Sequence, residues 1–253
     1  MKITFLGSGT SQGVPIIACS CPICLSTNPK DKRLRSSVLI QIEDKNIVVD
    51  TGPDFRQQML NCKIKHLDAI LFTHAHRDHL AGLDDIRGFN YIMQKPIDVY
   101  CEDIVEAAIK KEFFYAFTEP KYPGVPEMNL HSITSQPFSL FNTQIEPIRV
   151  LHYKLPVLGF KVNNFVYITD ANRIEEQEIE KINGCDVLVL NALRREHHIS
   201  HFTLQEAIDM SKRVGAKQTY FTHISHQLGF HDEVENELPE NIHLAYDGLE
   251  IEL

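Results

Sequence analysis

Three histidines and an aspartate fall within six residues of the sequence, at His74, His76, Asp78 and His79. They directly follow the apolar run 68–72, and a new apolar element begins after them, so the pattern predicts a strand-to-helix turn. His74 and His76 alternate to one face of an extended segment, whereas Asp78 and His79 lie on the turn and can face a second ion. Imidazole and carboxylate suit zinc, manganese or iron. The spacing therefore predicts a site for two metal ions.

Composition narrows the class of protein around this motif. The chain has 253 residues, 43% of them hydrophobic, and no linker or charge block, so a single domain over residues 1–253 is predicted. A net charge of −9 disfavours a large nucleic acid as the partner. No signal peptide and no run of the about 18 apolar residues that span a membrane is present, which predicts a cytoplasmic protein without membrane contact.

Three of the six cysteines are clustered, at Cys19, Cys21 and Cys24. Their spacing suits a tetrahedral zinc but supplies only three ligands, so a distant histidine or cysteine must complete the site. The alternative is a reduced loop without metal, and we favour the structural zinc. The other three are interpreted as small buried hydrophobic residues: Cys62, Cys101 and Cys185.

Further metal-ligand types stand where predicted strands end. His152 follows a strand over 144–151, Asp170 follows one over 165–169, and His223 follows one over 218–221. Strand ends gather at one edge of a sheet, so these residues can join the opening motif. Each ion then has three ligands, and Asp170 is left to bridge the two ions. The two triads are His74, His76 and His152, and Asp78, His79 and His223.

Other segments carry weaker signals. The glycine-rich loop 7–15 lacks the lysine and spacing of a P-loop, so phosphate binding there is disfavoured. Asp50 ends a strand and can either orient a histidine or cap a turn. Residues 102–117 have helical periodicity, which predicts a helix. The aromatic segment 113–126 is compatible with a lid, a substrate wall or a dimer contact, but a segment that merely covers the core is favoured. An Asp-Gly hairpin is predicted over 245–251.

The series His-x-His-x-Asp-His, followed by a distant His, Asp and His in that order, resembles the metallo-β-lactamase superfamily over essentially the whole chain. The resemblance implies an α/β (α+β) fold, a four-layer αββα sandwich with two mixed β-sheets inside. The three-cysteine loop and the ending Thr222-His223-x-x-His226 are similar to the PhnP-like cyclic phosphodiesterases. In those enzymes the last histidine completes a structural zinc, which implies His226 as the fourth ligand here.

The same resemblance implies a function. The expected enzyme is a metal-dependent phosphodiesterase that hydrolyses a small phosphodiester, cyclic and of sugar or nucleotide type. Its cofactors are two divalent ions, Zn or Mn, roughly 3.5–4 Å apart, which activate a hydroxide, and one structural zinc. The predicted catalytic residues are Asp78 and His201. His201 precedes a capping-box helix that starts at Thr203. By this place it resembles the family's histidine that protonates the leaving oxygen or holds a phosphoryl oxygen. The alternative is that His201 is only a neighbour of the helix cap.

Two other functions stay open. Enzymes that process the 3′ end of tRNA use the same seven ligands, but they typically carry a basic, glycine-rich arm that this sequence lacks, and the acidic balance disfavours them. PqqB-like binding or carrier proteins share the glycine-rich start and the cysteine loop. They depart from the full ligand set, whereas Asp78, His152 and Asp170 are all present here. A thiolester hydrolase or a β-lactamase is a lesser alternative. A homodimer is compatible with the sequence.

Overall fold

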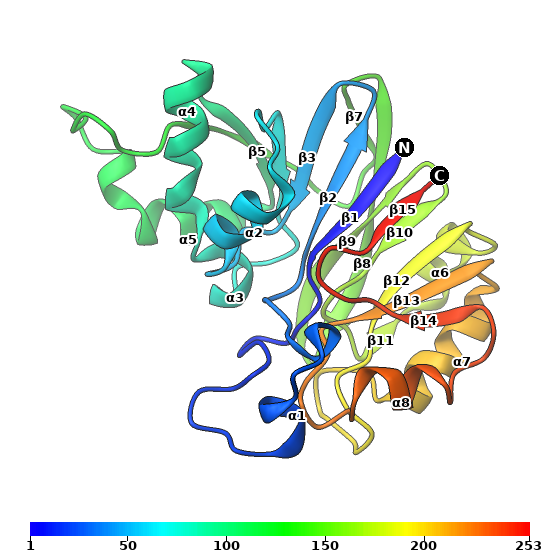
Figure 1. Ribbon diagram of the computed structural model, residues 1–253. Coiled ribbons are helices and arrows are strands. Elements are labelled where there is room, and N and C mark those ends of the chain that lie inside the picture. Colours follow the sequence, from blue (N-terminus) through cyan, green and yellow to red (C-terminus); the bar gives the residue numbers. More distant parts are fainter. The chain divides into compact units, whose positions relative to one another are not determined.

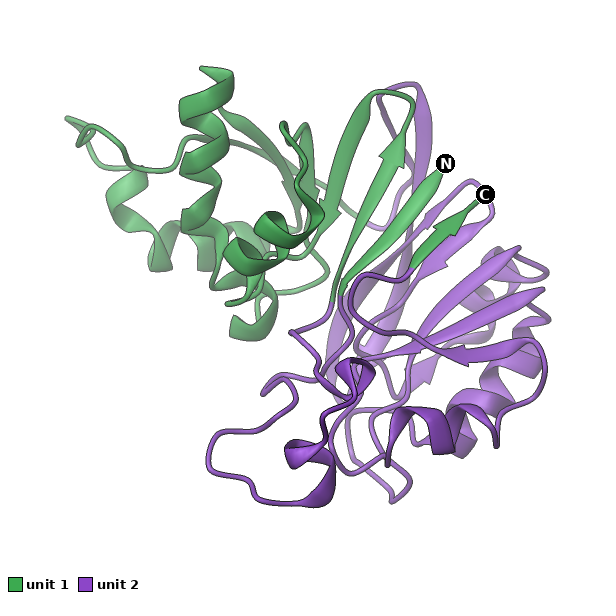
Figure 2. Cartoon of the chain, viewed as in Figure 1, with its two compact units in different colours: residues 1–6, 37–134, 250–253 green, residues 7–36, 135–249 purple.

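The computed structural model describes residues 1–253 and divides them into two compact units. The first comprises residues 1–6, 37–134 and 250–253, and the second residues 7–36 and 135–249 (Figure 2). Each unit contains its own sheet, and their helices and strands are labelled in Figure 1. None of the helices combines the length and the apolar character that a membrane crossing requires.

The sheet of the first unit is mixed. Its strands lie in the order β15-β1-β2-β3-β4-β5-β6, antiparallel for the pairs β1–β15 and β2–β3 and parallel from β3 to β6. The strands are β1 (Lys2–Gly7), β2 (Ser37–Ile42), β3 (Lys45–Val49), β4 (Ala69–Leu71), β5 (Ile97–Cys101), β6 (Met128–Ser132) and β15 (Glu250–Glu252). The two chain ends therefore lie on neighbouring strands (Figure 1).

The helices of the first unit bury one face against this sheet. Phe55 and Val105 belong to the same hydrophobic cluster as Val48, Ile70 and Val99 from three of the strands. The helices are α2 (Phe55–Cys62), α3 (Arg77–Leu80), α4 (Arg87–Met93) and α5 (Asp103–Glu112), with 3-10 turns η2 (Leu83–Ile86) and η3 (Phe114–Ala116).

The sheet of the second unit is also mixed. Its order is β11-β8-β9-β10-β12-β13-β14, and β7 also pairs with β8; the strands from β7 to β11 pair antiparallel, whereas β10, β12, β13 and β14 run parallel. The strands are β7 (Phe138–Leu140), β8 (Thr143–His152), β9 (Leu155–Val162), β10 (Phe165–Tyr167), β11 (Arg173–Ile174), β12 (Val187–Asn191), β13 (Gln218–Thr222) and β14 (Ile242–Leu244).

Three longer helical segments of the second unit pack on its sheet. Ile179, Ala207 and Val234 join a cluster with the strand residues Ile148 and Leu188. The capping box predicted at Thr203 is present, and Gly215 closes its helix with a left-handed backbone. The helices are α1 (Pro22–Leu25), α6 (Glu176–Ile182), α7 (Leu204–Val214) and α8 (His231–Glu235), with the 3-10 turn η1 (Pro29–Asp31).

In each unit, parallel strands bring polar residues to one edge. Val49 pairs with Leu71 where β3 and β4 end, which places Asp50 level with the start of the histidine motif. In the second unit β8, β10, β12 and β13 all run in one direction, so the residues after their last positions share the carboxyl edge. The predicted class, α+β with two mixed β-sheets, is confirmed.

Two predicted elements are wrong. Residues 245–251 do not form a hairpin: a turn does occur at Asp247, but β14 pairs with β13 and β15 pairs with β1. The Asp247 carboxylate instead accepts hydrogen bonds from Ser8 and from the Leu34 amide, which fixes the turn to another part of the chain. The helix predicted over 102–117 is shorter, because α5 ends at Glu112 and a 3-10 turn follows.

Candidate metal centres

Asp50 organises the histidine motif of the first unit. It has a left-handed backbone (φ 65°) immediately after β3, and its side chain is fully buried. Its carboxylate accepts hydrogen bonds from the Thr73 amide (2.9 Å), from the Thr73 hydroxyl (2.8 Å) and from His79 Nδ1 (2.7 Å). Burial raises the pKa of Asp50, and the His79 ring and the bonds from Thr73 partly offset that rise. The prediction that Asp50 can orient a histidine is confirmed.

These bonds also fix the tautomers of two rings. A carboxylate only accepts, so the nitrogen of His79 beside Asp50 carries its proton, and the lone pair of that ring is on Nε2. The single hydroxyl proton of Thr73 goes to Asp50, so the Thr73 oxygen accepts from His74 Nδ1 at 2.9 Å. The lone pair of His74 is therefore also on Nε2. A histidine that donates one N–H to an oxygen and presents the other nitrogen is the usual form of a metal ligand.

The other members of the motif lie against these two rings. Asp78 Oδ2 is 3.1 Å from His79 Nε2. The His74 ring is 4.5 Å from that of His76 and 4.3 Å from that of His79, measured between ring centroids. His74 and His79 are buried, whereas His76 is exposed. All four residues of the predicted motif are thus brought together on the turn after β4.

Asp170 is the centre of the corresponding group in the second unit. It follows β10, is buried, and lies 3.1 Å from His223 Nδ1, 3.2 Å from His201 Nε2 and 3.9 Å from His152 Nε2. His152 Nδ1 donates to the Ser200 carbonyl at 2.9 Å, so its lone pair is on Nε2, the nitrogen that faces Asp170. His152, Asp170 and His201 each offer a ligand atom within 4.8 Å of the others.

His201 lies among the predicted ligands of this unit. Its ring stacks on that of His223 (4.8 Å between centroids, 13° between planes) and meets that of His152 edge-on at 4.6 Å. The sequence favours no functional role for His198, yet its Nδ1 lies 3.2 Å from His201 Nδ1. Burial, with the neighbouring His201, lowers the pKa of His198. No sequence signal distinguished it from the exposed His197.

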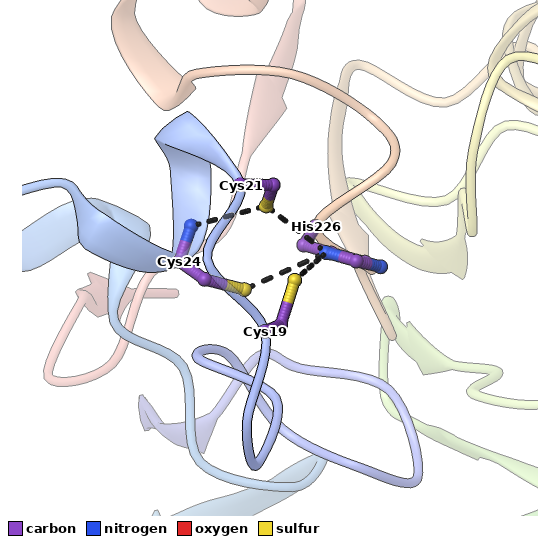
Figure 3. Close-up of side chains that lie close together, drawn as sticks. All are labelled: Cys19, Cys21, Cys24 and His226. Carbon is purple, nitrogen blue, oxygen red and sulfur yellow. Dashed lines mark hydrogen bonds between the residues drawn. The ribbon is translucent and has the colours of Figure 1, made fainter.

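The cysteine cluster assembles as its spacing predicts (Figure 3). His226 Nδ1 lies 3.4 Å from the Cys19 sulfur, 3.2 Å from that of Cys21 and 3.5 Å from that of Cys24. In a tetrahedral zinc site with Zn–S of about 2.3 Å and Zn–N of about 2.05 Å, the N···S edge is about 3.6 Å. The three nitrogen-to-sulfur distances are therefore close to those that a structural zinc requires, and all four donor atoms lie within 4.8 Å of one another.

The protein chain also prepares these sulfurs. The Cys24 amide donates to the Cys21 sulfur (3.4 Å), and the Ile16 amide donates to that of Cys24 (3.4 Å). The Cys24 amide is the largest influence that lowers the pKa of Cys21, to about 6. Burial raises the pKa of Cys24 to about 11, although the Ile16 amide opposes this rise. Amide donors to sulfur favour the thiolate form that binds zinc.

The glycine-rich loop has a structural role. Its amides are used within the protein: Gly9 donates to Leu34, and Thr10 donates to the carbonyl of Ile224. A Cβ on Gly9 would lie 2.9 Å from the Cβ of Arg33, so only glycine fits this close approach. This use of the amides agrees with the prediction that the loop is a poor phosphate site.

A buried arginine near the loop could not be found from the sequence. Arg33 is 5% exposed, and its guanidinium donates to the Ser8 hydroxyl (2.8 Å), the Ala245 carbonyl (2.5 Å) and His231 Nδ1 (3.1 Å). Because arginine cannot accept, His231 is the acceptor and is neutral at that nitrogen. Burial lowers the pKa of His231 to about 4 and raises that of Asp247 to about 6.

Comparison with known proteins agrees with the fold. The family model described as the beta-lactamase superfamily domain matches residues 45–224, and the chain belongs to this family of metallo-β-lactamase-fold hydrolases. Its structure is similar to that of a diphosphatase from the PhnP family, with a TM-score of 0.93 and 38% identity over 100% of this chain and 97% of the other. The chain is therefore a PhnP-like member of the superfamily. This fold implies divalent metals.

Two further relatives differ in what they share with the chain. An octanoyltransferase from Porphyromonas gingivalis is 41% identical over 99% of this chain, but the chain spans only 51% of that protein's length. Zn(2+)-bound PqqB from Methylobacterium extorquens has a TM-score of 0.81 at 18% identity over 100% of both chains, which is a likeness of fold.

Proposed function

We propose that this chain, acting as one hydrolase domain over residues 1–253, hydrolyses a small phosphodiester with two divalent metal ions. The observation that carries the proposal is the orientation of His74, His79 and His152. Each donates its Nδ1–H to an oxygen and keeps its lone pair on Nε2. A loop that only caps a helix does not require this orientation of its imidazoles. The orientation occurs at the strand ends of both units. The proposed ligands are His74, His76, Asp78, His79, His152, Asp170 and His223.

The donor set fits two ions of the zinc or manganese type, because it consists of imidazole nitrogens and carboxylate oxygens. When bound, a pair of such ions polarises a phosphoryl oxygen and lowers the pKa of water, which supplies a nucleophile at neutral pH. Asp50 holds His79 in one orientation and tautomer. We assign Asp78 to ligation and His201 Nε2 to a phosphoryl oxygen or to protonation of the leaving oxygen.

A structural zinc on Cys19, Cys21, Cys24 and His226 is part of the proposal. The distances from His226 Nδ1 to the three sulfurs are close to those of a tetrahedral site, and four protein ligands leave no position for a reacting water. His226 is three residues from His223, so zinc at this cluster would hold the segment that carries a ligand of the active site. Its expected contribution is to stability and to the position of that segment.

A small substrate is favoured over tRNA. Nucleic-acid binding depends on lysine and arginine contacts to phosphates, and the chain has 34 acidic against 25 basic residues. The similarity to a PhnP-family diphosphatase supports a phosphate-containing substrate as well. We leave zinc and manganese open, since imidazole and carboxylate ligands serve both.

Acyl transfer, suggested by the name of the Porphyromonas gingivalis relative, has less support in this chain. Acyl transfer through a thiol needs an accessible thiolate. Burial raises the pKa of Cys62, that of Cys101 to about 12 and that of Cys185 to about 11, which disfavours their thiolates at neutral pH. The remaining three cysteines, Cys21 among them, are assigned to the structural zinc. The chain spans about half of that relative, so the transferase activity of the longer protein can reside in the other half.

The test is the Asp78→Ala variant assayed on bis(p-nitrophenyl) phosphate. We expect a loss of more than about 100-fold in kcat, because changing partners that merely orient a metal ligand already costs 10–100-fold. Asp44→Ala, at an exposed carboxylate that pairs with Lys45, is the matched control and should keep wild-type activity. Unchanged turnover in Asp78→Ala would contradict the proposal and favour a binding or carrier protein.

The substrate class is tested on the wild-type protein. Ribose 1,2-cyclic phosphate esters, 2′,3′-cyclic nucleotides and a precursor tRNA are assayed side by side, with metal analysis of the same sample. We expect hydrolysis of a small cyclic ester and up to three ions per chain. Cleavage of the tRNA alone would support the processing enzyme instead, and a single ion in total would refute the metal scheme.

A further inference from the structure

The first unit contains a groove that the proposed reaction does not use. It has a volume of about 580 Å³ and lies between α2 with residues 64–65 on one side and the segment 85–92 on the other. Small-molecule sites have volumes of about 300–1,000 Å³. Its apolar lining consists of Phe55, Met59, Leu60, Ile64, Phe89 and Ile92.

Two of these aliphatic side chains are unusually open to solvent. Leu60 is 54% exposed and Ile92 is 69% exposed, although each lies beside other apolar groups that could cover it. Single exposed aliphatic residues are common, but these two line one groove together with four other apolar side chains. An apolar ligand would bury both side chains.

The charge around the groove specifies the other end of the ligand. Three basic residues, Arg56, Lys65 and Arg87, line it beside a single carboxylate, Asp85, in a chain whose net charge is −9. Arg87 is paired with Asp84 at 3.1 Å, whereas neither Arg56 nor Lys65 forms a salt bridge. Long basic side chains can lie along an apolar surface with their charges at its rim. The groove thus combines an apolar lining with three exposed basic side chains.

We propose that this groove binds a single-chain amphiphilic anion of the alkyl carboxylate type. The alkyl chain would contact Met59, Ile64 and Phe89, and the carboxylate would lie at Arg56 and Lys65. The volume favours a small molecule over a helix of a partner protein, and the surplus of positive charge favours an anion over a neutral lipid.

Calorimetric titration of the full chain with decanoate tests the site. We expect one saturable site per chain, about tenfold weaker binding of octanoate because two methylenes are lost, and much weaker binding of decanol and of decyltrimethylammonium. Equal binding of decanoate and decyltrimethylammonium would overturn the proposal, because it would show adsorption without a specific anion site.

Variants locate the site and separate it from folding. Gly88 lines the groove, and a Cβ there meets no atom within 4 Å, so Gly88→Leu should fill the groove, abolish binding and leave α4 intact. Arg56→Glu should weaken decanoate binding at least tenfold and leave decanol unchanged. Ile92→Glu places a negative charge in the groove and should also weaken decanoate binding. Its control is Ile104→Glu, at a residue of α5 that is 65% exposed and outside the groove. Wild-type binding by both Gly88→Leu and Ile92→Glu would overturn the proposal. It would also be overturned if the wild type were a dimer that Ile92→Glu dissociates, because the groove would then be a contact between two copies of the chain.

Discussion

The second unit contains two clusters of ligand-type side chains that differ in chemistry and in burial. Cys19, Cys21, Cys24 and His226 present three sulfurs and one nitrogen, and only Cys24 among them is buried. His152, Asp170, His201 and His223 present nitrogens and carboxylate oxygens, and all four are buried. The cysteine cluster supplies the four donors of a closed structural zinc site. The second cluster has three imidazoles around one carboxylate, and the proposed function divides these four groups between two ions and the substrate.

The difference indicates how one protein can separate stability from chemistry. Three thiolates and an imidazole saturate a zinc ion and leave no room for a substrate. Imidazoles and a carboxylate leave an ion able to accept further oxygen ligands. The chain places the two sets only three residues apart, at His223 and His226. We therefore expect substitutions in the cluster around Asp170 to alter activity and substitutions in the cysteine cluster to alter stability.

The largest expected effect is that of Asp170→Asn. Its carboxylate lies within 4 Å of three histidines, and the amide that replaces it has one oxygen and no charge. We predict a loss of more than about 100-fold in kcat on bis(p-nitrophenyl) phosphate, with a melting temperature close to that of the wild type. Asp186→Asn, at a carboxylate just before β12, is the matched control. Equal losses in the two variants would show that the effect of Asp170→Asn is not specific to the histidine and aspartate cluster.

A smaller effect, on stability, is expected from Cys24→Ala. Loss of one sulfur should remove the structural zinc and lower the free energy of unfolding by about 3 kcal/mol or more, because metal binding contributes directly to folding. Cys185→Ala, which also removes a buried thiol but lies outside the cluster, should lower it by about 1 kcal/mol. Urea unfolding and metal analysis measure both. If Cys24→Ala lost activity but no stability, the assignment of the cysteine cluster to structure would be wrong.

Much of the predicted histidine and aspartate site could be read from the sequence because its members lie at strand ends. The motif at 74–79 and the strand-end positions of His152, Asp170 and His223 follow from local patterns of apolar residues, and parallel strands then bring such ends to one edge. The association of His226 with the cysteines came from the resemblance to a family. Local pattern and family resemblance thus supplied the predicted ligands.

Contacts between distant parts of the chain were not predictable. Nothing in the sequence around Arg33 shows that its guanidinium is buried against Ser8 and Ala245. The same is true of Asp247, whose Asp-Gly pair looked like a hairpin turn but whose side chain holds the glycine-rich loop. A turn signal describes the backbone of two residues, whereas strand pairing depends on which neighbours are available.

This arginine network links the two clusters, because Ser8 and Thr10 form backbone bonds with Ile224, which lies between His223 and His226. Two of its groups titrate in opposite senses. Burial raises the pKa of Asp247 to about 6, so its contribution to stability is lost as the pH rises from about 4 to about 6. Burial lowers the pKa of His231 to about 4, so its contribution is lost as the pH falls from about 6.5 to about 4.

The smallest expected effect follows from this opposition. Between about pH 4 and pH 6 the folded wild type holds one proton more than the unfolded chain at Asp247 and one fewer at His231. The two contributions to the pH dependence of stability therefore largely cancel. Asp247→Asn should make stability rise between pH 4 and 6.5, and His231→Gln should make it fall, each by at most about 3 kcal/mol, since one pKa unit corresponds to about 1.4 kcal/mol. Urea unfolding at several pH values measures the slopes. Parallel slopes in the two variants would show that Asp247 and His231 do not titrate as a compensating pair.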